Sequence, residues 1–384
     1  MNLESFDIHP ARGFLPRADP LRSLPAEYAA WEETARALPK LLSAGVARDA
    51  LGRMPALDTD GLTTDAQLRR AMLLLSYFGH AYVWGAEPPA RSLPPNLALP
   101  WCRIAAALGR PPVLSYASYA LDNWRRLDAQ RPIELGNIVL LQNFLGGMDE
   151  EWFILVHVDI EAKAANAIAA LVDAQAAAAA ADPGALIASL ARLSAAIARM
   201  QATLNRMPER CDPYVYFMRV RPYIHGWKDH PALPDGLLYE GVDGFRGEPQ
   251  EFRGETGAQS SIVPALDAGL GVTHQNDALA SYLREMRLYM PPQHRDFVDD
   301  LARRSQVRDA VRDSNSAELR AIYNACLRAL GDFRSLHVDF AHRYIQQQAE
   351  RTSANPSELG TGGTPFMPYL KKHRDETMTH LLPD

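Results

Sequence analysis

A helical stripe of apolar residues late in the chain constrains the fold most strongly. From Glu318 to about Gln348, apolar positions recur at spacings of three and four, which places them on one face of an α-helix. The stripe consists of Leu319, Ile322, Tyr323, Cys326, Leu327, Leu330, Phe333, His337, Phe340, Ala341 and Tyr344. A helix of this length must bury its apolar face against other helices, so the pattern predicts a helical bundle.

The same spacing recurs upstream and predicts a mainly α fold. Residues 149–207 are rich in alanine and follow the helical period. The turn signal at Pro183-Gly184 divides them into two helices, which run antiparallel if the loop is short. Residues 111–126 and 278–290 show the pattern again, and a last helix is expected at the C-terminus.

The chain is long enough for two domains. It has 384 residues against roughly 150 per domain, and 47% hydrophobic residues can form a sizeable core. The proline-rich segment Pro88–Pro100 interrupts helical structure. We expect a small N-terminal helical domain over residues 1–110 and a larger helical domain over residues 111–384, with a boundary that could extend to about residue 145. Residues 214–261 form a glycine-rich irregular connection, which is usually functional at this length.

Composition narrows the class of partner. A net charge of -6 supplies no basic face for nucleic acid or an anionic membrane. Cys102, Cys211 and Cys326 lie far apart, so neither a disulfide framework nor a thiolate zinc site is expected. The N-terminus lacks the features of a secretory signal, and polar residues interrupt the alanine-rich stretch. A small ligand or a protein partner, in a reducing cytoplasm, fits these observations.

The sequence lacks the common local motifs for cofactors and catalysis. It contains no GxxxxGK[ST], GxGxxG, HExxH or GxSxG, and no CxxCH for covalent haem attachment. His157 and Glu161, spaced i and i+4, could hold a metal ion. Two ligands are too few, however, and an ion-paired helix face is the simpler interpretation.

Several ordered segments nevertheless match one known family. On its own, His337 on the apolar stripe would be read as a hydrogen-bonded core histidine. Residues 333–337 (FRSLH) and the following Tyr344-Ile345 resemble the proximal-ligand helix of the indoleamine 2,3-dioxygenase family. Further segments follow that family in order: residues 221–228 (RPYIHGWK), 238–241 (LYEG), 257–261 (GAQSS), 289–295 (YMPPQHR) and 360–364 (GTGGT). The resemblance covers most of the chain from about Tyr116 onward.

The resemblance implies a non-covalently bound haem b. His337 would be the iron ligand, and a neutral imidazole can bind the iron on one face and leave the other open to dioxygen. Arg334 lies one helical turn earlier and could pair with a haem propionate. Asp267 matches the acidic residue that holds this arginine in the family.

A substrate pocket on the opposite face would need aromatic walls and a cation for a carboxylate. The residues alone leave Arg219 and Arg221 as equal candidates for that cation, and the resemblance selects Arg221. The matching pocket positions are Tyr116, Tyr119, Phe153, Tyr216, Phe217, Gly257 and Thr361, although aromatic residues at helical spacing are more often plain core.

Two positions depart from the mammalian members. His157 stands where they carry a serine, and a histidine there is similar to the tryptophan 2,3-dioxygenases, in which it hydrogen-bonds the indole N–H. Glu255-Thr256 replaces a Gly-Ser pair. Because an unpaired buried carboxylate is costly, Glu255 is expected to point to solvent, to bind a substrate ammonium or to signal a different substrate.

The expected protein is therefore a haem dioxygenase of tryptophan catabolism in the kynurenine pathway. It would use dioxygen and an unidentified reductant to open the indole C2–C3 bond of L-tryptophan or a related indoleamine, giving N-formylkynurenine. His157 would be the catalytic residue of the distal pocket. The alternatives are a haem-dependent oxygenase or hydroxylase of a modified tryptophan in a biosynthetic pathway, and a non-catalytic haem-binding sensor.

Overall fold

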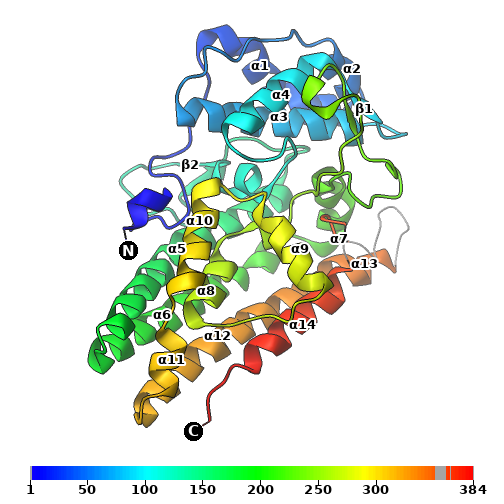
Figure 1. Cartoon of the computed structure of the whole chain (residues 1–384). Coiled ribbons are helices and arrows are strands. Elements are labelled where there is room, and N and C mark those ends of the chain that lie inside the picture. The colour runs from blue at the N-terminus through cyan, green and yellow to red at the C-terminus, as the bar shows by residue number, and fades with distance from the viewer. Residues whose placement is uncertain (1, 351–359, 364, 384) are drawn as a thin grey trace.

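The computed structural model describes residues 2–350, 360–363 and 365–383, and its structure is mainly helical (Figure 1). The predicted fold class is thus confirmed. The longer helices are α1 (Ala29–Ser43), α3 (Asp65–Trp84), α4 (Pro95–Ala107), α5 (Met148–Ala179), α6 (Pro183–Leu204), α8 (Ile262–Leu270), α9 (Ala278–Arg287), α10 (Pro292–Arg304), α12 (Ala317–Ala341) and α14 (Phe366–Met378). Short helices are α2 (Ala47–Gly52), α7 (Pro213–Val215), α11 (Val307–Arg312) and α13 (Gln347–Ala349).

In the described part of the chain, β-structure is confined to two small pairs. Strand β1 (Ser92–Leu93) pairs in parallel with β4 (Leu238–Tyr239), so a segment near the N-terminal helices is tied to the irregular connection. Strand β2 (Trp124–Arg126) pairs antiparallel with β3 (Ile138–Leu140). These pairs attach loops to the helical framework.

The alanine-rich region forms two long helices, as predicted. Three acidic residues in the first turn of α5 favour its N-terminus, and Asp182 caps α6 immediately before Pro183. Helix α12, capped by Ser316, packs along α6 and α14 (Figure 1). The histidine-bearing stripe is therefore part of a bundle, and it continues beyond α12 through a π-helical turn, His342–Gln346.

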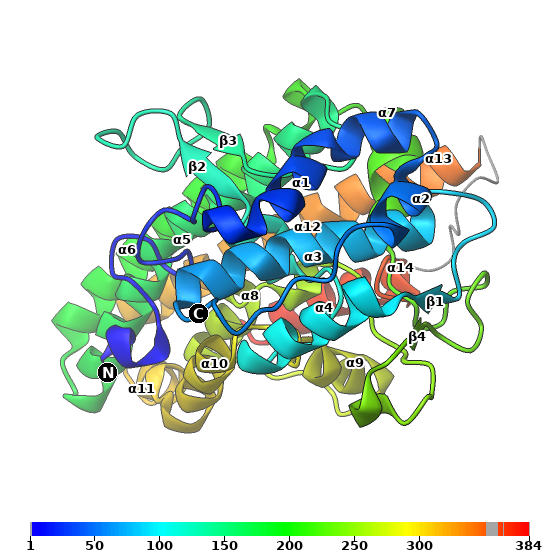
Figure 2. The same cartoon turned by 90° about the horizontal axis from the view of Figure 1, so that it is seen from above.

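Helices α1 to α4 lie at one end of the molecule, and Figure 2 shows α3 and α4 over the rest of the chain. A capping box between Thr64 and Gln67 begins α3, most of which is buried. Buried apolar residues form one cluster around these helices and another around α5, α6 and α12. The division into domains at about residue 110 stays a prediction, because the first cluster also includes later residues such as Trp227 and Tyr289.

Two sequence-based expectations of local structure were wrong. The helix expected over residues 111–126 is a single π-helical turn, Ala117–Leu121, followed by β2, because pairing with β3 holds residues 124–126 extended. The proline-rich break ends at Pro94, since Pro95 occupies the first turn of α4, where a missing N–H costs no hydrogen bond.

The sequence predicted a glycine-rich segment and a last helix near the C-terminus. The last helix is confirmed as α14. Of the tail that begins at Ser353, residues 353–359, Thr364 and Asp384 lie outside the described residues. Within the described part, no helix is long and apolar enough to cross a membrane.

The contact between α3 and α4 makes Gly79 a sensitive position. A Cβ atom added at Gly79 would overlap the ring of Trp101, which is fully buried and has no room to move. We expect Gly79→Ala to lower the free energy of unfolding by about 1–3 kcal/mol despite the better helix propensity of alanine. Urea unfolding measures this. In the control Gly184→Ala, the added Cβ atom lies 3.5 Å from Asp182 Oδ1, an ordinary van der Waals contact, so the change should be neutral or stabilising. Equal effects of both changes would contradict the packing argument.

Candidate active site

A cavity of about 610 Å³ lies between α5, α8, α9, α12 and α14. The turn at Tyr216, residues 255–258 and the glycine loop Gly360–Gly362 complete its walls. Apolar side chains such as Phe333, Phe340 and Phe366 form much of the lining. A cavity of this size and polarity is suited to a flat organic ligand with a few polar groups.

His337 projects from α12 into this cavity. It borders the cavity and is accessible from it, and no hydrogen bond to either ring nitrogen occurs among the described residues. Desolvation of the ring lowers the pKa of His337 to about 4, and the nearby His157 contributes to this shift. The imidazole is thus neutral at pH 7 and offers a lone pair to the cavity.

His157 faces the same cavity from α5. Its Nδ1 lies 2.7 Å from the carbonyl oxygen of Phe153, and a carbonyl only accepts, so Nδ1 carries the proton. Burial lowers the pKa of His157, which keeps the ring neutral and leaves Nε2 as an acceptor. Aromatic contacts with Phe153 and Tyr116 hold the ring in place.

A buried ion pair positions the helix that carries His337. Arg334 on α12 lies 2.6 Å from Asp267 on α8 and also bonds Thr377 on α14. Although burial alone would raise the pKa of Asp267, the charge of Arg334 and the hydrogen bond from His274 lower it to about 2. The carboxylate is therefore charged at neutral pH, and the predicted pairing of Arg334 with Asp267 is present.

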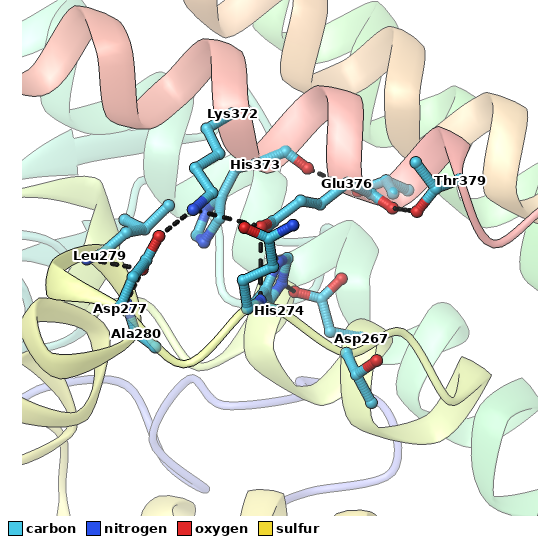
Figure 3. Close-up of polar contacts among 12 residues, drawn as sticks. Asp267, His274, Asp277, Leu279, Ala280, Lys372, His373, Glu376 and Thr379 are labelled. Atoms are coloured by element: carbon cyan, nitrogen blue, oxygen red, sulfur yellow. Dashed lines mark hydrogen bonds and ion pairs between the residues drawn. The ribbon is translucent and has the colours of Figure 1, made fainter.

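The ion pair extends into a polar network on α14 (Figure 3). His274 lies 3.1 Å from Asp267 and 2.6 Å from Glu376. Although its burial lowers the pKa, the hydrogen bonds to the two carboxylates raise the pKa of His274 overall. Lys372 pairs with Asp277 and with Glu376, so the network joins α14 to the segment after α8.

His373 was not anticipated from the sequence. It stacks on His274 with ring centroids 4.3 Å apart, and it borders the cavity. Burial and the charge of Arg334 lower its pKa to about 3. Its Nε2 has no hydrogen-bond partner among the described residues, so this side chain and Arg334 provide polar contacts at one edge of the cavity. A single histidine in a polar helix gave no local signal of this role.

The structure brings most of the predicted site residues to the cavity wall. The residues that border it are Phe153, His157, Tyr216, Gly257, Asp267, Arg334, His337 and Thr361. Tyr116, Tyr119 and Phe217 are buried behind this wall: Tyr119 packs on Phe153. The aromatic positions thus divide into lining and supporting residues.

Arg221 lies behind the wall as well, and it is fully buried. Its guanidinium stands over the ring of Phe217, and burial lowers its pKa to about 10. Arg219, the alternative that the sequence left open, is exposed. Of the two arginines, Arg221 is therefore the one close to the cavity.

Glu255 borders the cavity and is only 4% exposed. Burial raises its pKa to about 8. Of the three expectations for this residue, orientation toward bulk solvent is thus ruled out. Its main-chain oxygen accepts a hydrogen bond from the Thr361 hydroxyl at 2.5 Å, which links it to the glycine loop.

The pair His157 and Glu161 does not form a metal site in this structure. Glu161 accepts hydrogen bonds from Ser260 at 2.9 Å and from Tyr116, and His157 Nδ1 is engaged with Phe153. No group of three or more His, Cys, Asp or Glu side chains in the described residues could hold a metal ion. The expected ion-paired helix face is not formed either, because Glu161 is fully buried and accepts from two neutral hydroxyl groups.

Comparison with known proteins agrees with this geometry. A family model for indoleamine 2,3-dioxygenase matches residues 2–380. The chain belongs to the indoleamine 2,3-dioxygenase family. It is 36% identical to human indoleamine 2,3-dioxygenase 2, over 100% of this chain and 96% of that protein, and 36% identical to rat indoleamine 2,3-dioxygenase 1, over 99% and 96%. A 6-hydroxytryptophan 2,3-dioxygenase of Fusarium equiseti is 32% identical, over 99% and 98%.

Membership of the indoleamine 2,3-dioxygenase family confirms the resemblance and extends it through the N-terminal hundred residues, where the sequence matched only loosely. It also confirms the predicted enzyme class, a dioxygenase, and the family is haem-dependent. The roles of individual residues stay predictions.

Breaking the buried Arg334–Asp267 pair by removing one partner should be strongly destabilising. Asp267→Asn leaves a buried guanidinium without its negative partner, so we expect the free energy of unfolding at pH 7 to fall by about 3–5 kcal/mol in urea unfolding. Asp173→Asn, which breaks an exposed pair with Arg192, should change it by less than about 1 kcal/mol.

The loss of stability caused by Asp267→Asn should become smaller as the pH falls. The pKa of Asp267 is lowered from 3.8 to about 2 on folding, so its contribution is fully present above pH 3.8 and is lost as pH falls through 2. Wild type and variant should converge only in strong acid. If Asp267→Asn lowers the free energy of unfolding at pH 7 by no more than Asp173→Asn does, this account is contradicted.

Proposed function

We propose that this protein opens the indole C2–C3 bond of L-tryptophan or a related indoleamine with dioxygen, giving N-formylkynurenine. The observation that carries the proposal is the placement of two neutral imidazoles, His337 and His157, on α12 and α5 around one cavity. One suits an iron ligand, and the other suits a hydrogen-bond acceptor for an indole N–H.

The residues present fit a non-covalently bound haem b. A haem iron needs only an axial ligand from the protein, because the porphyrin supplies the others, and His337 has an available lone pair. Arg334 and His373 border the cavity and would provide polar partners for the propionate groups of a haem. Ferrous haem supplies the dioxygen chemistry when it is bound.

The protein groups would orient the substrate. His157 Nε2 accepts a hydrogen bond from the indole N–H, since Nδ1 is committed to Phe153. Arg221 provides the positive charge for the substrate carboxylate, and Phe153 and Tyr216 pack against the indole. Thr361 and Gly257 border the cavity from two loops joined by the Thr361–Glu255 hydrogen bond, and these loops exclude water.

The expected setting is a reducing cytoplasm with a reductant that keeps the iron ferrous. Cys102, Cys211 and Cys326 are all unpaired, which supports a reducing compartment. No basic face for nucleic acid is expected from the net charge of -6.

A second candidate is the oxidation of a modified tryptophan in a biosynthetic pathway. Two observations favour it: a relative is named for 6-hydroxytryptophan, and the buried acid Glu255 borders the cavity. The mass of the product from a panel of tryptophan and hydroxytryptophans separates the two. A non-catalytic haem-binding sensor would give no product from any indole under reducing conditions.

His337→Ala tests the proposed cofactor site. Because His337 is the proposed iron ligand, we expect the variant to lose most of its haem after purification and its turnover of L-tryptophan. The haem-to-protein ratio and the Soret band measure this. His342→Ala, an exposed histidine on the following turn, is the matched control and should bind haem normally. An unchanged Soret band and full activity in His337→Ala would refute the assignment.

His157→Ser tests the distal role. Loss of one neutral hydrogen bond costs about 0.5–1.5 kcal/mol, so kcat/KM for L-tryptophan should fall by roughly tenfold or less. The fall should be smaller for 1-methyltryptophan, which has no N–H to donate. Because the pKa of His157 is lowered from 6.5, wild-type activity should weaken only in more acidic solution. Abolished turnover of both substrates at normal haem content would show instead that the imidazole takes part in the chemistry.

A further inference from the structure

The three buried glutamates with raised pKa values differ in how the fold satisfies them. Glu150 accepts hydrogen bonds from the backbone N–H groups of residues 144–146, and Glu161 accepts from Ser260 and Tyr116. Glu255 is equally buried, yet no hydrogen bond or ion pair to its carboxyl group occurs among the described residues. A buried acid without a protein partner, at the wall of a cavity, indicates that the partner is the ligand.

The surroundings of Glu255 specify the kind of ligand. Tyr216 lines the cavity and interacts with both charged groups. Burial raises the pKa of Tyr216, the charge of Glu255 raises it further, and the charge of Arg221 lowers it. The segments that carry Glu255 and Arg221 cross at Gly254 and Gly226, where a Cβ atom on either glycine would overlap the other backbone. Glu255 N–H also bonds the carbonyl of Ile224. Glu255 at the cavity wall and Arg221 behind that wall thus belong to segments whose backbones are fixed against each other.

We propose that Glu255 binds the ammonium group of the substrate, while Arg221 binds its carboxylate, so that the cavity selects indoles that carry a free amino acid group. This inference rests on the proposed function and assigns the substrate class of that same site. A zwitterion carries its two opposite charges close together, which complements a carboxylate and a guanidinium held on adjacent segments.

Binding of an ammonium group should release a proton from Glu255. Burial raises the pKa of this carboxyl to about 8, so it is mostly protonated at pH 7 and must ionise to pair with a cation. Glu150 and Glu161, whose pKa values burial raises to about 7, also titrate near this range, but both accept hydrogen bonds from the protein, and a ligand without an ammonium group controls for their effect. The other neighbouring groups do not titrate in this range, because the pKa values of the tyrosines are raised above 10, that of Arg221 is about 10 and those of the cavity histidines are lowered. These groups are Tyr77, Tyr116, Tyr119, Tyr216, Arg221, His157, His337 and His373.

The test compares three ligands with haem-loaded protein, and the change in the Soret band gives each Kd. L-tryptophan has both charged groups, tryptamine has only the ammonium, and indole-3-propionate has only the carboxylate. Glu255→Gln should weaken L-tryptophan and tryptamine by about tenfold or more and indole-3-propionate by less than about twofold. Arg221→Ala should show the reverse, weakening L-tryptophan and indole-3-propionate but not tryptamine.

Glu251→Gln is the matched control, since it makes the same chemical change at an exposed position four residues earlier. It should leave all three Kd values unchanged. Equal weakening of all three ligands by Glu255→Gln, or weakening of none, would overturn the proposal. 6-Hydroxytryptophan is measured as a fourth ligand, and a loss confined to it would also overturn the proposal and would assign Glu255 to a ring hydroxyl.

The wild-type protein provides a test that needs no variant. Its Kd for L-tryptophan should fall by about tenfold from pH 6.5 to 8.5, as Glu255 ionises more readily, while that for indole-3-propionate stays flat. A flat profile for L-tryptophan would refute the ammonium role. These binding measurements are independent of turnover: wild-type protein that binds with this selectivity but forms no N-formylkynurenine would refute the proposed function and leave the ammonium site standing.

Discussion

The buried pair of Arg334 and Asp267 holds together the walls of the cavity. It joins α12, which carries His337, to α8, and through His274 and Glu376 it reaches α14. Burying two charges is costly unless each is paired and hydrogen-bonded, and here the guanidinium also bonds Thr377. The orientation of His337 toward α5 thus depends on an interaction one helical turn away from it.

Burial shifts the pKa values of acids and bases in opposite directions, and both shifts favour the neutral forms of His157, His337 and Glu255. It lowers the pKa values of His157 and His337 and raises that of Glu255. At pH 7 the histidines keep their lone pairs, and the Glu255 carboxyl group is mostly protonated. These three groups therefore carry little charge before a ligand binds, whereas Arg221 behind the cavity wall stays charged.

The sequence predicted the long helices and the helix that carries His337, because helical periodicity and ordered motifs are local signals. It predicted α5, α6, α12 and α14, and the pairing of Arg334 with Asp267. The predicted helix over residues 111–126 was wrong, because the pairing of β2 with β3 is a tertiary contact that no local pattern encodes. The role of His373 and the burial of Glu255 were equally out of reach, because both depend on which distant segments enclose the side chain.

The central claim is that the cavity between His337 and His157 directs both atoms of dioxygen into an indole. Haem-loaded, reduced protein should be supplied with L-tryptophan under ¹⁸O₂, and the mass of the product should be determined. The account predicts N-formylkynurenine that carries two labelled oxygen atoms. A hydroxylated tryptophan with one labelled atom, or unchanged tryptophan at full haem content, would contradict it.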